Sequence, residues 1–267
     1  MSSKYLSVFN ISFQQEFAYR LNFVMWRVRN VLSIILIFYL WDSVFTNNSN
    51  VFGYDRDRML TYVFGVMILR AVVFSNRGTE IAGQISSGDI VNYLLKPIDY
   101  FKYWFTRDIS SKSLNLLFAG VEFVVLYLLL RPPFFFQTNI LYIFLFLVAV
   151  VFSILLFYFI LIIVSMITFW VPEAGWPGQF LFIGILTTFL SGTVFPIDVL
   201  PNAIRNVVYL LPFPYLLFFP LQVYLGKMFL FDVVVGMAIS VIWLAVLYKI
   251  SLKMWHRGLR YYVAFGK

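Results

Sequence analysis

Residues 140–171 read ILYIFLFLVAVVFSILLFYFILIIVSMITFWV, and this stretch decides the class of fold. The hydrocarbon core of a bilayer is about 30 Å thick and needs about 20 apolar helical residues to cross it. The stretch exceeds that length, so it predicts a membrane-spanning helix that tilts or protrudes into the interface.

The composition of the whole chain agrees with this assignment. Of the 267 residues, 62% are hydrophobic, 21% aromatic and only 12% charged. Soluble domains carry roughly 25% charged residues, and a chain this poor in charge could not cover a soluble surface. The sequence therefore predicts a multi-span integral membrane protein without a sizeable soluble domain.

Working outward from residues 140–171, five further apolar runs are bounded by polar or proline-rich segments. The resulting prediction is an all-α integral membrane protein with six transmembrane helices in one domain that covers residues 1–267. The predicted spans are Val28–Phe45, Met59–Phe74, Ser113–Leu130, Ile140–Val171, Gly178–Phe195 and Phe229–Leu252.

The distribution of basic residues predicts the orientation. With the N-terminus in the cytoplasm, fourteen of the 20 lysines and arginines face inward, five face outward and Arg70 lies within a span. This satisfies the positive-inside rule, and the inverted topology would violate it. We therefore expect both termini in the cytoplasm. The inward set is Lys4, Arg20, Arg27, Arg29, Arg77, Lys96, Lys102, Arg107, Lys112, Lys249, Lys253, Arg257, Arg260 and Lys267.

An amphipathic pattern precedes the first span. Apolar residues recur there at steps of three and four, which is typical of one face of a helix. Residues 1–27 therefore predict a helix that lies in the cytoplasmic interface of the membrane. The apolar face consists of Leu6, Phe9, Phe13, Phe17 and Leu21.

The longest predicted cytoplasmic segment, residues 75–112, contains a second short helix. Asp89 is a favourable N-cap, and Pro97 ends the helix after Lys96. The aliphatic side chains of Ile90, Val91, Leu94 and Leu95 share one face. Such a helix either lies on lipid or docks into the groove of a cytoplasmic partner.

Three stretches of the sequence resemble motifs of a known family. The stretch Ser87-Gly88-Asp89-Ile90-Val91-Asn92-Tyr93-Leu94-Leu95-Lys96-Pro97-Ile98 is similar to a loop in permease subunits of ATP-binding-cassette exporters of the ABC type-two family. Further similarities are Ser191-Gly192-Thr193-Val194-Phe195-Pro196-Ile197-Asp198-Val199-Leu200-Pro201, with Leu211-Pro212-Phe213 and Pro220, and the tail Gly258-Leu259-Arg260-Tyr261-Tyr262. The three motifs occur in family order and extend over essentially the whole chain.

The resemblance implies a function and partners. Permeases of this family dimerise in the cell membrane, and each seats a cytoplasmic coupling helix in a separate ATPase subunit that holds ATP and Mg²⁺. By position, the coupling helix here is Asp89–Lys96, flanked by Gly88 and Pro97. The partner permease is either a second copy or a sibling chain. The sequence has no G-x-x-x-x-G-K-[ST] loop that could cradle ATP phosphates, so we expect ATP hydrolysis on the partner chain.

Two charged residues lie well away from the ends of their predicted spans. Arg70 and Glu122 lie at similar depths from the cytoplasmic end, roughly 10 and 14 Å at 1.5 Å per residue. Charges at such depths are usually paired or functional. The two residues are therefore predicted to form a salt bridge or to contribute to a substrate path.

Residues 190–227 predict a re-entrant helical element on the outer side, between spans five and six. Five of the ten prolines fall here, which makes a straight span improbable although the segment is apolar. We expect Asn202–Leu211 to be helical and to pack into the outer mouth of a dimer; the alternative is a helix lying flat on the outer leaflet. The predicted gate residues are Phe195, Pro196, Pro201, Leu211, Pro212 and Phe213.

Other functional classes remain as alternatives. A passive channel or membrane scaffold fits the same composition. An intramembrane enzyme acting on lipid needs converging histidine, aspartate or serine groups or metal ligands. The spans hold one glutamate, no histidine and no cysteine, so neither a catalytic nor a metal site is expected on this chain.

Overall fold

The computed structural model describes residues 3–18, 20–74 and 77–262, and this part of the chain is helical apart from its loops and one isolated β-bridge between Val51 and Tyr54. The helices are α1 (Ser3–Ala18), α2 (Arg20–Phe45), α3 (Arg56–Val73), α4 (Gly78–Ser87), α5 (Val91–Leu94), α6 (Tyr100–Leu130), α7 (Ile140–Met166), η1 (Ile167–Phe169), η2 (Pro172–Ala174), α8 (Gly175–Gly178), η3 (Gln179–Leu186), α9 (Thr187–Leu190), η4 (Ile197–Val199), α10 (Asn202–Tyr209), η5 (Phe213–Tyr215), α11 (Phe218–Tyr224) and α12 (Leu230–Tyr261).

Five helical segments in the described ranges are long and apolar enough to cross a membrane. The all-helical membrane architecture predicted from the sequence is thus confirmed. The segments are Arg27–Phe45, Arg56–Ser87 (which runs across residues 75–76, outside the described ranges), Tyr100–Leu130, Ile140–Phe169 and Leu230–Tyr261.

The remaining predicted span, Gly178–Phe195, has a different form. Its helical part runs through α8, the π-helix η3 and α9, and it ends at Leu190 rather than at Phe195. Together these elements contain sixteen residues, fewer than the 20 or so that a straight crossing needs. The sixth crossing therefore stays a prediction.

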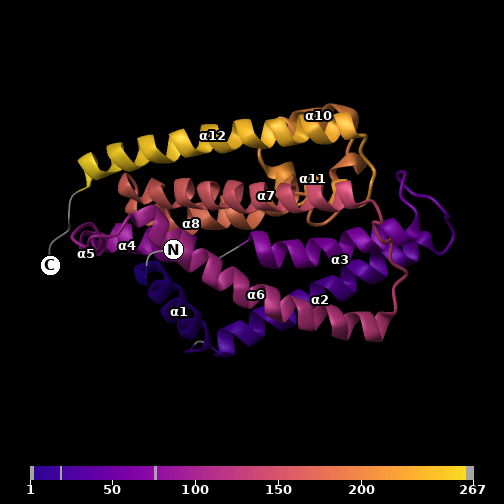
Figure 1. Ribbon diagram of the computed structural model, residues 1–267, viewed down its shortest axis with the longest axis horizontal. Coiled ribbons are helices and arrows are strands. Elements are labelled where there is room, and N and C mark those ends of the chain that lie inside the picture. The colour runs from indigo at the N-terminus through magenta and orange to yellow at the C-terminus, as the bar shows by residue number, and fades with distance from the viewer. Residues whose placement is uncertain (1–2, 19, 75–76, 263–267) are drawn as a thin grey trace.

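The central helix of the bundle is α7. It packs against α12 on one side and contacts α3 on the other, and it also contacts α11 (Figure 1). Because α7 is apolar all round, packing rather than polarity selects its buried face. That face includes Ser153, Leu156, Phe157, Ile160 and Val164, which follow the three-to-four-residue period of a helix.

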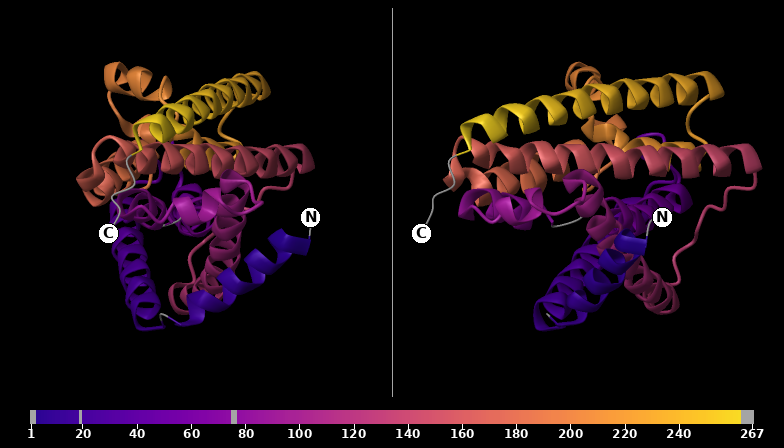
Figure 2. Two further views of the ribbon diagram at one scale, coloured as in Figure 1. Left: turned by 90° about the vertical axis from the view of Figure 1, so that its left-hand side faces the viewer. Right: turned by 60° about the vertical axis from the view of Figure 1, so that its left-hand side comes forward.

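The helices α2, α3 and α6 form the other side of the molecule, with α3 in contact with both neighbours (Figures 1 and 2). On α6, side chains such as Leu117, Val121 and Leu128 are exposed. Exposed apolar surface of this extent is typical of a membrane-facing helix. Helix α6 begins at Tyr100, so much of the predicted loop 75–112 is helical.

The N-terminal helix α1 packs along the first turns of α6. Ser110 Oγ donates to the Phe9 carbonyl at 3.1 Å, and Asp99 N–H donates to Tyr5 Oη at 3.3 Å. Phe9 is half-buried, whereas Leu6 is 55% exposed. The predicted apolar face is thus divided between α6 and the surroundings, and the side chains of Phe17 and Leu21 lie outside the described residues.

The elements separate into two ends. Helices α1, α4 and α5 and the last turns of α12 lie toward the left of Figure 1. The loop between α2 and α3, helix α10 and the start of α12 lie toward the right. Each end contains one of the two segments that the sequence singles out. The left-hand end contains the α4–α5 unit (residues 78–98), and the right-hand end contains the α10–α11 hairpin (residues 198–227).

Candidate functional site

The α4–α5 unit turns sharply between its two helices. Helix α4 ends at Gly88, whose left-handed backbone (φ 90°) favours glycine because the residue lacks a Cβ. The Ile90 N–H then donates to the Gln84 carbonyl at 3.1 Å, which holds α5 against α4. The Ile90 side chain is fully buried, so it anchors α5 to the body of the protein.

The opposite side of α5 projects outward. Leu94 is 44% exposed and Leu95 80% exposed. Leu95 borders a shallow hollow of about 530 Å³, which is also lined by Gln84, Asp89, Asn92, Tyr93 and Lys96. Two exposed leucines beside a polar hollow form a surface suited to a protein partner.

The structure corrects the prediction for this helix in two respects. The helix spans only Val91–Leu94, one turn, and Asp89 does not cap it, because its carboxylate accepts a 2.7 Å hydrogen bond from Ser87 Oγ instead. The four aliphatic residues also do not form one docking face. Ile90 points into the protein, Val91 is half-buried, and only Leu94 and Leu95 are exposed. Pro97 follows the helix as predicted.

The base of α4 is fixed to α7 and to the start of the π-helix. Ser165 Oγ donates to the Gly78 carbonyl at 3.0 Å, and Gln179 Nε2 donates to Ser165 Oγ at 3.0 Å. All three residues are buried. A displacement of α4 would therefore act directly on the first residue of η3, and π-helices are frequent at functional sites.

A charged network joins α4 to α6. Glu80 accepts from Arg77 and, at 3.1 Å, from Arg107 Nη2. The Arg107 guanidinium also lies over the Trp104 ring at 4.9 Å and donates to Gln15 of α1 at 3.2 Å. Arg107 thus connects three helices beside the α4–α5 unit.

At the other end, the α10–α11 hairpin extends far along α12 and α7. Trp243 Nε1 donates to the Leu210 carbonyl at 3.2 Å, and Ser153 Oγ donates to the Tyr215 carbonyl at 2.8 Å. Trp243 and Ser153 each lie about 20 Å along their helices from Leu230 and Ile140, at 1.5 Å per residue.

The chain then returns toward the start of α7. Gln137 Nε2 donates to the Tyr224 carbonyl at 2.9 Å, and Tyr142 Oη donates to the Met228 carbonyl at 3.0 Å. Both donors lie at or just before the beginning of α7. Residues 210–216 are therefore the deep tip of the hairpin, and α11 leads back out.

Two glycines create the slot for α11. A Cβ at Gly65 of α3 would lie 2.5 Å from Leu221 Cδ2, and a Cβ at Gly236 of α12 would lie 2.2 Å from Phe219 Cε2. Real Cβ contacts are not this short, so any larger residue would push α11 away. The side chains of Leu221 and Phe219 are almost fully buried in this slot.

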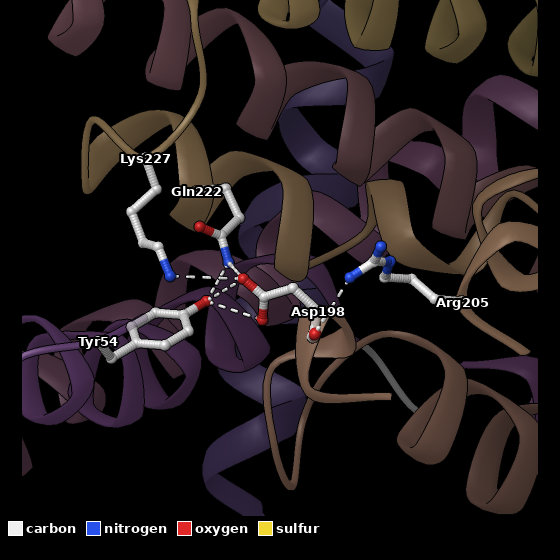
Figure 3. Close-up of polar contacts among 5 residues, drawn as sticks. All are labelled: Tyr54, Asp198, Arg205, Gln222 and Lys227. Carbon is white, nitrogen blue, oxygen red and sulfur yellow. Dashed lines mark hydrogen bonds and ion pairs between the residues drawn. The ribbon is translucent and has the colours of Figure 1, made fainter. Parts of the chain in front are cut away.

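A polar cluster closes the hairpin at its outer end (Figure 3). Asp198 accepts from Tyr54 Oη at 2.9 Å, from Gln222 Nε2 at 3.3 Å and from Lys227 Nζ at 3.4 Å. Figure 3 also shows Arg205 on the other side, where it donates to the Asp198 carbonyl at 3.5 Å. Asp198 thereby joins the α2–α3 loop, α10, α11 and the loop before α12.

Burial sets the protonation states in this cluster. Burial, and then the Asp198 carboxylate, raise the pKa of the Tyr54 phenol well above its ordinary value. Tyr54 therefore stays a hydrogen-bond donor. Burial lowers the pKa of Lys227, and the Asp198 carboxylate opposes that change. Lys227 Nζ also lies 2.9 Å from the centre of the Tyr54 ring.

The predicted gate residues divide between the two ends of the hairpin. Leu211, Pro212 and Phe213 belong to the deep tip. The proline-flanked segment with Phe195, Pro196 and Pro201 lies next to Asp198, near the outer cluster. The deepest burial is in α11 rather than in Asn202–Leu211, because α10 exposes Ile204, Val207 and Leu210. The packing of Asn202–Leu211 into the outer mouth of a dimer stays a prediction.

The cluster around Asp198 was missed as a site. Its signal in the sequence is faint: Asp198 is the acidic residue of the motif at 191–201, and Gln222 is a lone polar side chain in the apolar run 215–223. Tyr54 and Lys227 come from distant loops, and no local spacing connects them.

The intramembrane salt bridge differs from the prediction. Glu122 pairs with Arg27 at 3.3 Å, not with Arg70, and Arg27 also donates to Asn115 Oδ1 at 2.5 Å. The Arg70 guanidinium lies over the Phe74 ring, 6.0 Å from its centre. A further buried ion pair, Asp108–Lys112 on α6, was not predicted, although its i,i+4 spacing is the usual signal for such a pair.

The described residues contain no group of three histidine, cysteine, aspartate or glutamate side chains that could hold a metal ion. In comparisons with known proteins, the model of a family described as "ABC-2 family transporter protein" matches residues 31–266. Among curated proteins, no sequence matches the chain. The family match begins in α2, includes both ends of the molecule and extends past the end of α12.

Proposed function

Because this chain belongs to the ABC-2 family of transporter membrane proteins, we propose that it is the membrane-spanning subunit of an ATP-driven exporter. It forms a substrate path as a dimer, with either a second copy or a sibling permease. A separate ATP-binding-cassette ATPase holds ATP and Mg²⁺ and drives it from the cytoplasmic side. Both termini then face the cytoplasm of the cell membrane, in accord with the positive-inside rule.

The observation that supports this proposal is the exposed pair Leu94–Leu95 at the tip of α5. A partner that binds these leucines pushes or pulls on α5, and Ile90 passes the force to α4 because its side chain is fully buried. From α4 the contacts of Gly78 with Ser165, and of Ser165 with Gln179, reach the π-helix. The α4–α5 unit is therefore the coupling element of the proposal.

The α10–α11 hairpin is the outer gate of the proposal. We propose that α8, η3 and α9 form the remaining crossing and that the hairpin re-enters the membrane from outside. Non-helical backbone at membrane depth survives only where protein or a cavity satisfies it. At the tip this requirement is met by Trp243 and Ser153, which donate to the carbonyls of Leu210 and Tyr215.

The test is whether an ATPase depends on the exposed leucines. A Leu94→Ser/Leu95→Ser double variant should lose the copurifying ATPase and ATP-dependent transport while the membrane subunit remains folded. Leu6→Ser is the matched control, since Leu6 is 55% exposed on α1 at the same end of the molecule. A double variant that retains both the ATPase and transport contradicts the proposal. Substrate flux that is indifferent to ATP would favour a passive channel.

A further inference from the structure

Arg70 occupies an unusual electrostatic position. It lies in the last turn of α3, where a positive charge interacts favourably with the helix dipole, and its side chain is half-buried. Its neighbours are apolar: Leu69 and Val73 are almost completely buried, and the Phe74 ring lies beneath the guanidinium. Phe74 in turn stacks on Phe157 of α7 at 4.8 Å, which makes an aromatic floor.

The charges around Arg70 do not neutralise it. Among the described side chains, no aspartate or glutamate lies within ion-pair distance of Arg70, and the carboxylate expected there, Glu122, is bound to Arg27. The charged group that acts on Arg70 is Arg29 of α2, a second cation. A charge within a membrane span is costly unless a partner compensates it, and Arg70 lies in a candidate span.

We propose that the Arg70 guanidinium binds the phosphate of an anionic amphiphile at the end of α3 that leads into α4. Arginine presents its N–H groups in a planar fork that matches two oxygens of a phosphate. Helix α3 lies in a candidate membrane span, so a lipid headgroup reaches this depth with its acyl chains along the bundle. The Phe74 ring, which stacks on Phe157, covers one flat face of the guanidinium.

The same chemistry also fits a free phosphate anion, and the test separates the two sources. This inference concerns binding alone, so it holds or fails independently of the ATP-driven transport proposed above. The chain also contains a matched control. Arg260 is likewise an arginine in the last turn of a long helix, α12, but its side chain is exposed.

The experiment measures binding of dioleoyl-phosphatidylglycerol to the purified full chain by native mass spectrometry. Arg70→Gln should weaken binding about tenfold or more, because a charge-assisted phosphate contact is lost. Arg260→Gln should change binding by about twofold at most, since an exposed arginine is already solvated. Arg70→Lys keeps the charge but not the fork, and it should weaken binding by a few-fold.

Millimolar inorganic phosphate identifies the source. If phosphate displaces the lipid from the unaltered protein but not from Arg70→Lys, a free phosphate is sufficient for binding at Arg70. If phosphate does not displace the lipid, binding at Arg70 requires a headgroup that carries acyl chains. Both results support the site. The proposal is overturned if Arg70→Gln and Arg70→Lys bind the lipid as tightly as the unaltered protein, or if Arg260→Gln weakens binding as much as Arg70→Gln.

Discussion

The two ends of this membrane protein differ in which of their apolar side chains the chain itself buries. The α4–α5 unit buries one anchor, Ile90, and leaves Leu94 and Leu95 exposed. The α10–α11 hairpin buries nearly every side chain of α11 and closes its outer end around Asp198. At the first end, the chain leaves two leucines at the tip of α5 exposed; at the second, it encloses α11, although α10 stays on the surface.

This difference indicates how each end can work. A surface that is incomplete in one chain gains stability when a partner covers it, so it suits a docking site. A segment that its own chain already satisfies can move only if those contacts break together. In the proposed exporter, the α4–α5 unit therefore receives force, and the hairpin is the element whose opening costs free energy.

The largest expected effect comes from removing the anchor of the α4–α5 unit. Ile90→Ala should lower the free energy of unfolding by about 2–5 kcal/mol, because the side chain is fully buried and its removal leaves a cavity. Leu95→Ala, at 80% exposure, should change it by less than about 0.5 kcal/mol. Thermal or denaturant unfolding of both variants compares them. Equal losses would mean that α5 has no distinct inner and outer sides.

The next effect tests the slot that holds α11. Gly236→Val should cost about 1–3 kcal/mol of stability because the new side chain collides with Phe219. Gly120→Val on α6 is the control, since a Cβ there meets no atom within 4 Å. The unfolding of the two variants would be measured side by side. If Gly236→Val is as stable as Gly120→Val, α11 does not pack as closely as described.

A smaller effect is expected for the ion pair in the outer cluster. A double-mutant cycle with Asp198→Asn and Lys227→Met should give a coupling free energy of about 1–2 kcal/mol, because both side chains are largely buried. The exposed pair Asp42–Arg56 should give about 0–1 kcal/mol in the same cycle. A coupling for Asp198 and Lys227 no larger than that of the exposed pair would count against a closed outer cluster.

The smallest perturbation compares adjacent positions on α10. Single cysteines can be introduced without background, since the chain has none. Val207→Cys, at 61% exposure, should react with a membrane-impermeant thiol reagent from outside, and Val208→Cys, at 4%, should react only during ATP turnover. Reaction of either position from the cytoplasmic side would refute the proposed topology. Labelling of Val208→Cys that is indifferent to ATP would refute the proposed gate.

Much of the fold follows from the sequence because apolar length determines it. The runs at 28–45, 140–171 and 229–252 each exceed or approach the thickness of a bilayer, and each is helical in the structure. The segment at 178–195 deviates because it contains a π-helix and ends early at Leu190. Apolar composition does not distinguish a π-helix from an α-helix.

The sites were less predictable because they depend on distant contacts. Depth along straight spans suggested that Arg70 faces Glu122, but α2 begins at Arg20 and brings Arg27 to Glu122 instead. Spacing along the sequence could not show which arginine lies beside Glu122. The predicted cap at Asp89 is absent for a local reason: the Asp89 carboxylate accepts a hydrogen bond from the hydroxyl of Ser87, two residues earlier.

In the proposed exporter, α5 exposes a docking edge that the partner ATPase covers. The most direct measurement is the thiol labelling rate of Leu95→Cys and Ile90→Cys, determined with and without the ATPase. We predict rapid labelling of Leu95→Cys on the permease alone, strong protection in the complex, and little labelling of Ile90→Cys in either state. Labelling of Leu95→Cys at the same rate in the presence and absence of the ATPase would contradict the account.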